Sequence, residues 1–253
     1  MEICALASGS SGNCFYVGNK NGILIDAGIS TKQIIERLNI IKRKPENING
    51  IFITHEHSDH IKGADVFARK FNVPIFVTKK TFEHCFLCSD ENLVNFIKND
   101  ERVSLCGMEI EAFSKSHKCS DPVSFNIHNG KQISIITDVG YSCKNVIKSV
   151  SESDFLCIES NYDEEMLDNG RYPYFLKKWV KSDEGHLSNN QSALCVLENA
   201  SSNLKNVVLS HLSKNNNTSN IALKSFNILK ERRDLIPKVF ISERESPTKL
   251  FRI

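Results

Sequence analysis

The stretch Thr54-His55-Glu56-His57-Ser58-Asp59-His60 places three imidazoles and two carboxylates within seven residues. Directly before it, Ile51-Phe52-Ile53 has the composition of a short buried strand. The polar side chains should therefore leave the carboxyl end of that strand, where α/β sheets usually place their chemistry. Imidazole and carboxylate ligands together suit zinc, manganese or iron, in one site or in two neighbouring ones. A polar loop with solvated histidines is the alternative, but three histidines in six residues favour a metal site.

The composition is that of a globular protein. The 253 residues, 40% of them apolar, suffice for one large domain or two small ones. The chain contains no linker rich in Pro or Gly, no low-complexity tract and no short repeat, which favours a single domain over residues 1–253. The net charge is only +2. Any contact with DNA or RNA would therefore require a local basic patch.

The sequence predicts a cytoplasmic protein that does not enter a membrane. The first residues lack a basic leader before an apolar run, and no segment approaches the roughly 18 apolar residues that a membrane span requires. Nine cysteines, an odd number, are scattered through expected strands and helices, as is typical of reduced thiols. The pair Cys85-Phe86-Leu87-Cys88 has no second pair, which favours a structural role over zinc or redox chemistry. The oligomeric state stays open.

Apolar patterning predicts two strand-rich blocks, each followed by helices. Strands are expected at 3–7, 14–17, 22–26, 51–53, 73–77, 108–113, 123–128, 132–136, 155–158, 207–209 and 238–241. Helices are expected at about 31–40, 64–71, 79–87, 143–150, 189–200 and 219–231, with helical pieces in 160–187. Ser30 with Gln33, and Ser188 with Gln191, form capping boxes for two of these helices. The pattern favours an α/β fold of two sheets packed face to face with helices outside.

Three further candidate ligands follow apolar strands. His117, Asp138 and His211 come after the strands at 108–113, 132–136 and 207–209. A carboxylate that closes so apolar a run needs a partner, and a metal ion is one. Taken alone, each residue has another interpretation: a surface turn for His117, a helix N-cap for Asp138 and a loop residue for His211. The histidine stretch lacks enough ligands for two metal ions, so the shared placement favours their joining it.

Other polar residues are candidates for substrate contact or catalysis. His186 lies at a helix start and either contacts substrate or caps locally, and it is also a candidate acid. The turn Ser8-Gly9-Ser10-Ser11-Gly12-Asn13 offers amides and hydroxyls to a phosphate through Ser10, Ser11 and Asn13, and a plain hairpin turn is the alternative. Lys118 and Lys214, with Lys115, flank proposed ligands and either hold phosphates or are solvated. His84 and His128 are interpreted as structural.

The order of these residues resembles the metallo-β-lactamase fold superfamily: a histidine-rich stretch, a lone histidine, a strand-end aspartate and a final strand-end histidine. Three longer strings look like its YycJ/WalJ (VicX) group of single-domain bacterial hydrolases. These strings are Leu6–Cys14, Gly185–Asn189 and Leu209–Asn216. The sequence departs from that pattern at Tyr162, where relatives tend to carry His, and at Lys118, where an acidic residue is common.

The resemblance implies a four-layer αββα sandwich of two mixed β-sheets and a pair of divalent ions, zinc or manganese, with iron as a further option. It implies that one ion takes His55, His57 and His117, the other takes Asp59, His60 and His211, and Asp138 bridges the two. It also implies 5′-to-3′ exonuclease action on DNA through a metal-bridging hydroxide and a role in DNA repair. Asp59 and His186 are then the candidate catalytic residues.

Two alternatives remain at this point. The same dinuclear centre would serve a small-molecule hydrolase that cleaves a thioester, a lactone or a cyclic phosphodiester. A metal-stabilised binding module would use the same ligands without turnover.

Overall fold

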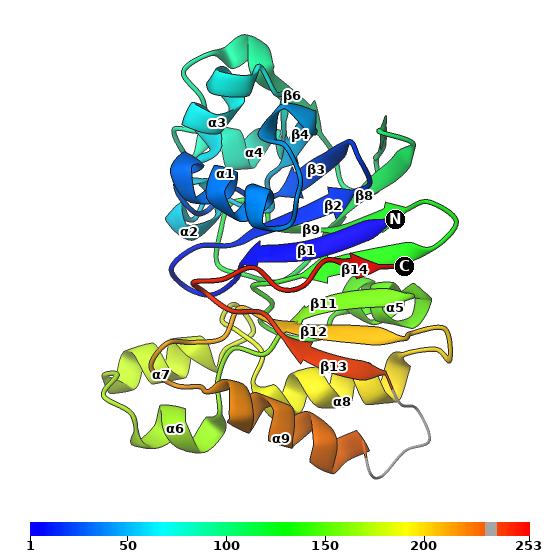
Figure 1. Cartoon of the computed structure of the whole chain (residues 1–253). Coiled ribbons are helices and arrows are strands. Elements are labelled where there is room, and N and C mark those ends of the chain that lie inside the picture. The colour runs from blue at the N-terminus through cyan, green and yellow to red at the C-terminus, as the bar shows by residue number, and fades with distance from the viewer. Residues whose placement is uncertain (231–236) are drawn as a thin grey trace. The chain divides into compact units, whose positions relative to one another are not determined.

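The structure is a computed structural model that describes residues 1–230 and 237–253 (Figure 1). These residues divide into two compact units. Unit 1 comprises Met1–Phe113, Cys119–Asn129 and Glu243–Ile253, and unit 2 comprises Ser114–Lys118 and Gly130–Ser242. A single domain over residues 1–253 stays a prediction. Within the described ranges, no helix is long and apolar enough to cross a membrane.

Unit 1 contains a mixed sheet with the strand order β14-β1-β2-β3-β4-β5-β6. Its strands are β1 Glu2–Ala7, β2 Cys14–Gly18, β3 Gly22–Ile25, β4 Ile48–Phe52, β5 Ile75–Thr78, β6 Val94–Ile97 and β14 Phe251–Arg252. Short turns join β1, β2 and β3, which pair antiparallel, whereas helical connections make β3 to β6 parallel. Because parallel strands end at a common edge, the residues that leave β3 and β4 lie close together.

The helices of unit 1 cover this sheet. They are α1 Thr31–Ile40, α2 Ser58–Ile61, α3 Ala64–Phe71 and α4 Lys79–Glu83, with the 3₁₀ helices η1 Pro45–Asn47 and η2 Glu91–Leu93. The predicted capping box of α1 is confirmed, since Ser30 and Gln33 exchange hydrogen bonds. Ile34 of α1, Phe67 of α3 and Ile51 of β4 are fully buried in one core. This core holds β4, and with it the start of the histidine stretch.

Unit 1 also contains β7 Arg102–Leu105, β9 Val123–His128 and all but the last residue of β8 Met108–Ser114. β7 and β8 pair antiparallel.

Unit 2 contains four parallel strands in the order β13-β12-β11-β10. Its elements are β10 Gln132–Ile136, α5 Lys144–Glu152, β11 Phe155–Glu159, α6 Glu164–Asn169, α7 Tyr174–Val180, α8 Asn189–Asn199, β12 Asn206–Ser210, α9 Ser219–Lys230 and β13 Lys238–Ile241. Every residue of β10 and β11 is buried, as is typical of parallel strands covered on both faces. α8 and α9 lie side by side in this unit (Figure 1). The carboxyl ends of β10, β11 and β12 share one edge.

The expected elements are largely confirmed, and the strands form two mixed β-sheets flanked by helices. The capping box of Ser188 and Gln191 is present at α8. The helix expected over 79–87 is shorter, because α4 ends at Glu83. β6, β7 and β14 were not expected from the sequence. The helix expected to end at Glu231 is described to Lys230, and Glu231 lies outside the described residues.

Candidate metal-binding clusters

The β4 cluster consists of His55, His57, Asp59 and His60 in unit 1. Two residues separate His55 from the end of β4, and His57 is the N-cap of α2, so Asp59 and His60 lie on that short helix rather than in a loop. His55 and His60 are fully buried. The Nε2 atom of His55 lies 3.0 Å from Nδ1 of His57, and Nε2 of His60 lies 3.5 Å from Oδ2 of Asp59. The sequence stretch thus gathers its donor atoms at one place.

A buried carboxylate, Asp26, orients this cluster. Its Oδ2 lies 2.7 Å from Nδ1 of His60, and its Oδ1 accepts a hydrogen bond of 2.8 Å from the backbone N–H of Thr54. The Thr54 hydroxyl contacts Asp26 and lies 2.9 Å from Nδ1 of His55. Since the Nδ1 side of each ring faces these groups, the Nε2 side of each ring faces the other donor residues of the cluster. Asp26 was not predicted from the sequence, although it closes an apolar strand as Asp138 does.

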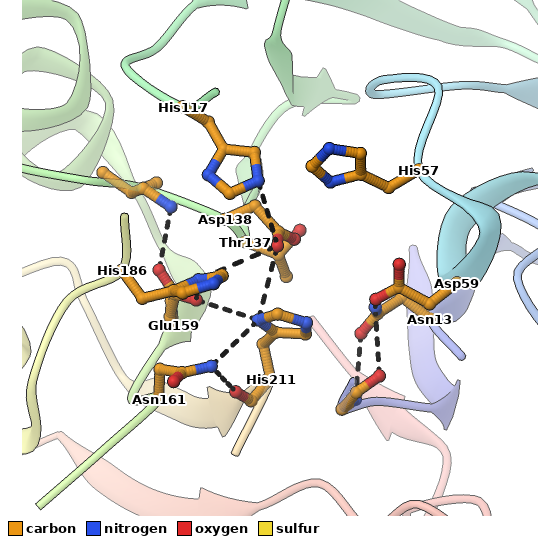
Figure 2. Close-up of polar contacts among 12 residues, drawn as sticks. Asn13, His57, Asp59, His117, Thr137, Asp138, Glu159, Asn161, His186 and His211 are labelled. Carbon is orange, nitrogen blue, oxygen red and sulfur yellow. Dashed lines mark hydrogen bonds and ion pairs between the residues drawn. The ribbon is translucent and has the colours of Figure 1, made fainter. Parts of the chain in front are cut away.

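Asn13 ties the Ser-Gly turn to the β4 cluster (Figure 2). Its Nδ2 lies 3.3 Å from Oδ2 of Asp59 and 3.0 Å from Nε2 of His60, while its Oδ1 accepts from the backbone of Gly9. The backbones also approach closely: a Cβ atom at Gly28 would lie 1.6 Å from the carbonyl oxygen of Asp59. Only glycine fits at that position. Asn13 is buried in this unit, where its amide contacts Asp59 and His60, and its contact with substrate stays a prediction.

The strand-end cluster consists of His117, Asp138, Glu159, His186 and His211 in unit 2. His117 follows β8, Asp138 follows β10, Glu159 ends β11, His186 precedes α8 and His211 follows β12. Donor atoms of Asp138, Glu159, His186 and His211 all lie within 4.8 Å of one another. Oδ1 of Asp138 lies 3.7 Å from Nε2 of His117. The structure thus brings together the three strand-end residues that the sequence predicted, His117, Asp138 and His211, and places His186 beside them.

Glu159 orients two of the histidines, as Figure 2 shows. Its Oε1 lies 2.7 Å from Nδ1 of His186 and 2.8 Å from Nδ1 of His211, and its Oε2 accepts from the backbone N–H of Val139 and Leu187. Burial alone would raise the pKa of Glu159, but the charge of His186 and the hydrogen bonds from both histidines lower it. The carboxylate is therefore ionised and accepts Nδ1–H from both rings.

His117 is held as a neutral imidazole. Its Nδ1 lies 3.1 Å from the carbonyl oxygen of Gly185, so this nitrogen carries the proton. Burial lowers the pKa of His117 to about 3, although the neighbouring Asp138 acts in the opposite direction. Its unprotonated Nε2 faces the carboxylate of Asp138. A neutral imidazole is the form in which histidine binds metals.

Backbone conformation marks three of these positions independently. Asp26, Asp138 and His211 have φ angles of 59°, 56° and 57°. Residues other than glycine uncommonly adopt this left-handed region, at a cost of about 1–3 kcal/mol where the conformation is strained, and such residues concentrate at functional sites. All three follow apolar strands, where the turn redirects a polar side chain.

The remaining candidates differ in exposure. Ser10, Ser11, Lys118 and Lys214 are exposed. Lys115 is buried, and its ammonium group donates to the carbonyl oxygen of Thr137, so it is not oriented toward solvent. Tyr162 is buried, and burial raises the pKa of its hydroxyl well above the usual range.

The donor sets fit divalent metal ions. Each cluster offers imidazole nitrogens and carboxylate oxygens that are oriented by a further buried carboxylate, Asp26 in one and Glu159 in the other. Imidazole with carboxylate suits zinc, manganese and iron.

Comparisons with known proteins agree with these observations. Residues 7–125 match the family described as the metallo-beta-lactamase superfamily. The chain is 33% identical to the exodeoxyribonuclease YycJ of Bacillus anthracis over 99% of this chain and 98% of that protein. It is 37% identical to the exodeoxyribonuclease WalJ of Streptococcus pneumoniae, over 86% of this chain and 83% of that protein. The chain belongs to the metallo-β-lactamase superfamily. Its resemblance to the YycJ/WalJ group is thereby confirmed.

A solved structure shows the same fold. The metallo-β-lactamase fold protein YhfI of Bacillus subtilis superimposes with a TM-score of 0.72, covering 98% of this chain and 98% of that chain at 12% identity. The predicted metallo-β-lactamase fold is confirmed. At this identity, the similarity concerns the fold alone.

Proposed function

We propose that the protein is a metal-dependent exonuclease that hydrolyses the phosphodiester bonds of DNA. The observation that carries this proposal is the match to relatives named exodeoxyribonucleases, which extends over 99% of the chain in one case. The histidine and carboxylate clusters of the two units supply suitable donors for divalent ions. Action in the 5′-to-3′ direction and a role in DNA repair are parts of the same proposal.

We assign the metal ligands by matching the family pattern to this sequence. One ion would take His55, His57 and His117, the other would take Asp59, His60 and His211, and Asp138 would bind both. Zinc and manganese both suit these donors, and iron is a further option. When bound, such ions supply Lewis-acid activation of water at neutral pH and neutralise charge on a phosphodiester.

The remaining chemistry falls to the side chains. His186, whose Nδ1 is held by Glu159, would give a proton from Nε2 to the leaving oxygen. Asp59, supported by Asn13, would keep the β4 cluster in its ligating geometry. The exposed side chains of Ser10, Ser11, Lys118 and Lys214 would contact backbone phosphates of the substrate.

A cytoplasmic location is part of this proposal. All nine cysteines lie in the described part of the chain, and each is a thiol rather than half of a disulfide. Burial raises the pKa of the thiols of Cys4, Cys14 and Cys195, which keeps them protonated and unreactive. Reduced thiols are typical of proteins in a reducing compartment.

The test uses purified protein loaded with manganese or zinc. Oligonucleotides labelled at the 5′ or the 3′ end, single-stranded and double-stranded, report both degradation and direction. Asp59→Ala and His60→Ala should abolish degradation and lower the bound metal while the proteins remain folded. His84→Ala changes an exposed histidine outside both clusters and serves as the matched control.

Two results would reject the proposal. If the metal-loaded protein leaves every oligonucleotide intact but cleaves thioesters, lactones or cyclic phosphodiesters, the small-molecule alternative holds. If Asp59→Ala and His60→Ala retain all biological function, the protein is a binding module instead of an enzyme.

A further inference from the structure

We propose that the outer surface of α7 binds a single DNA strand through aromatic stacking and lysine contacts. This α7 surface consists of Tyr174, Phe175, Lys177, Lys178 and Lys181 in unit 2. The inference rests on the proposed nuclease function, because it names the part of the protein that would hold the substrate strand. It concerns residues outside both metal-binding clusters.

The composition of this segment is unusual within the chain. Residues 171–181 read Arg-Tyr-Pro-Tyr-Phe-Leu-Lys-Lys-Trp-Val-Lys, with four cations, four aromatic rings and no carboxylate. The net charge of the whole protein is only +2, so a nucleic-acid contact has to come from a local patch. This segment is such a patch.

The inner side of α7 is packed and fixes the element in unit 2. Tyr172, Leu176 and Trp179 pack against a small core of Tyr162, Leu167 and Val180. The ring of Trp179 meets the ring of His186 edge to face, with centroids 5.6 Å apart, and the backbone N–H of His186 donates to the carbonyl oxygen of Val180. A strand held on α7 would therefore be attached to a packed element that also contacts His186.

The outer side of α7 leaves two adjacent aromatic rings in water. Tyr174 is 80% exposed and Phe175 is 73% exposed, more than any other large hydrophobic residue described in unit 2. Single exposed apolar side chains are ordinary on protein surfaces. Two neighbouring rings with this exposure, beside a cluster of lysines, offer stacking faces.

The lysines lie beside one of these rings, Tyr174, around a cavity of about 630 Å³, lined by Asp168, Tyr174, Lys177, Lys178, Lys181 and Ser182. Asp168 is its single carboxylate. That carboxylate pairs with Lys181, and the Asp168 carbonyl oxygen accepts a hydrogen bond of 2.7 Å from Lys177. Three lysines against one carboxylate give the cavity a positive charge, which suits an anionic polymer.

The combination favours a single strand over a duplex. Bases in a duplex are stacked on each other and hide their faces, whereas an unpaired base can stack on an exposed ring. Lysines beside the rings would meet the phosphates that link successive bases. A single strand supplies both kinds of partner at regular spacing, phosphates for the lysines and base faces for the rings.

The experiment measures binding in the absence of catalysis. Fluorescence anisotropy with a labelled oligothymidylate of about 12 nucleotides, within the site sizes that single-strand binders show, is recorded in EDTA. The double variant Tyr174→Ser/Phe175→Ser should bind at least about tenfold more weakly, as expected for the loss of two stacking rings. Phe86→Ser removes an aromatic side chain that is 74% exposed in unit 1 and should bind as the wild type does.

A second variant tests the charge. Lys178→Glu should weaken binding and lower the slope of log affinity against log salt by about 1. Lys32→Glu, at a lysine whose side chain is 86% exposed on α1, is the matched control. Thermal unfolding verifies that every variant is folded.

Two outcomes overturn the inference: equal binding by the wild type and the double variant, or wild-type binding to phosphatidylglycerol vesicles without binding to the oligonucleotide. Hydrolysis of bis(p-nitrophenyl) phosphate and of labelled DNA by the wild type separately tests the proposed nuclease function. Failure there leaves the binding result in EDTA interpretable by itself.

Discussion

The β4 cluster takes its four candidate donor residues from six consecutive positions, His55 to His60, whereas each residue of the strand-end cluster comes from a different segment between His117 and His211. Local sequence alone nearly forms the first cluster. The second depends on parallel strands that bring distant residues to one edge of a sheet. In both clusters, a buried carboxylate contacts Nδ1 of one or two histidines and so orients the rings.

The two orienting carboxylates, Asp26 and Glu159, hold different numbers of histidines. Asp26 holds one histidine and is itself held by the backbone and hydroxyl of Thr54. Glu159 holds two histidines and accepts two backbone N–H groups as well. A cluster assembled from separate segments should therefore depend more strongly on its carboxylate than a cluster formed by one short stretch. Three changes test this difference.

The largest effect is expected from Glu159→Gln. The amide can no longer accept hydrogen bonds at both ends, so its NH₂ group must face either the histidines or the N–H groups of Val139 and Leu187. Loss of such an orienting group typically weakens metal affinity by about 10–100-fold, and we expect the upper end. Competition with a chelator measures the affinity. Glu111→Gln, on β8 beside Arg102, is the control, and an affinity equal to wild type would remove Glu159 from this role.

An intermediate effect is expected from acid in the metal-free protein. The folded pKa of His117 is about 3, below its ordinary value of 6.5, so the unfolded chain binds a proton first. The contribution of neutral His117 to the free energy of unfolding is therefore fully present above about pH 6.5, and it is lost as the pH falls toward 3. Because the unfolded chain binds one more proton in this range, the free energy of unfolding falls by about 1.4 kcal/mol per pH unit, or by about 2 kcal/mol between pH 6.5 and 5. Urea unfolding at several pH values should show a shallower loss in His117→Asn, and identical slopes would contradict the assignment.

The smallest effect is expected from Asp26→Asn. One histidine loses its charged partner, while Thr54 still contacts His55, so metal affinity should fall by about tenfold. The same chelator competition measures it, with Asp65→Asn on α3 as the control, because that carboxylate pairs with Arg69 away from the ligands. If Asp26→Asn is more damaging than Glu159→Gln, the β4 cluster is the more dependent of the two.

The sequence revealed features that are encoded locally. The histidine stretch and the capping boxes of Ser30 and Ser188 involve residues within a few positions of one another, so their pattern is visible before folding. His117, Asp138 and His211 were found because each closes an apolar run. Which ligands share an ion came from the family resemblance, since spacing carries no such information.

The features that the sequence analysis missed depend on pairing over long distances. Asp26 and Glu159 contact histidines that are 34, 27 and 52 residues away in the sequence. Both end apolar strands, so the argument applied to Asp138 would have indicated them. β6 was missed because its burial does not alternate, and β14 was missed because two residues carry no periodic signal.

The pairing of β14 with β1 has a consequence for the order of synthesis. The backbone N–H of Thr248 donates to Ala5, that of Ser8 donates to Glu243, and Arg37 donates to the carbonyl oxygen of Arg244. The first strand of the chain therefore acquires its last partners only after about 240 further residues have left the ribosome. Until then, an edge of the unit 1 sheet stays open, and nascent chains are exposed to edge-to-edge association. Slow translation, or a truncation that removes β14, should thus prolong the exposure of the β1 edge and increase association at that edge.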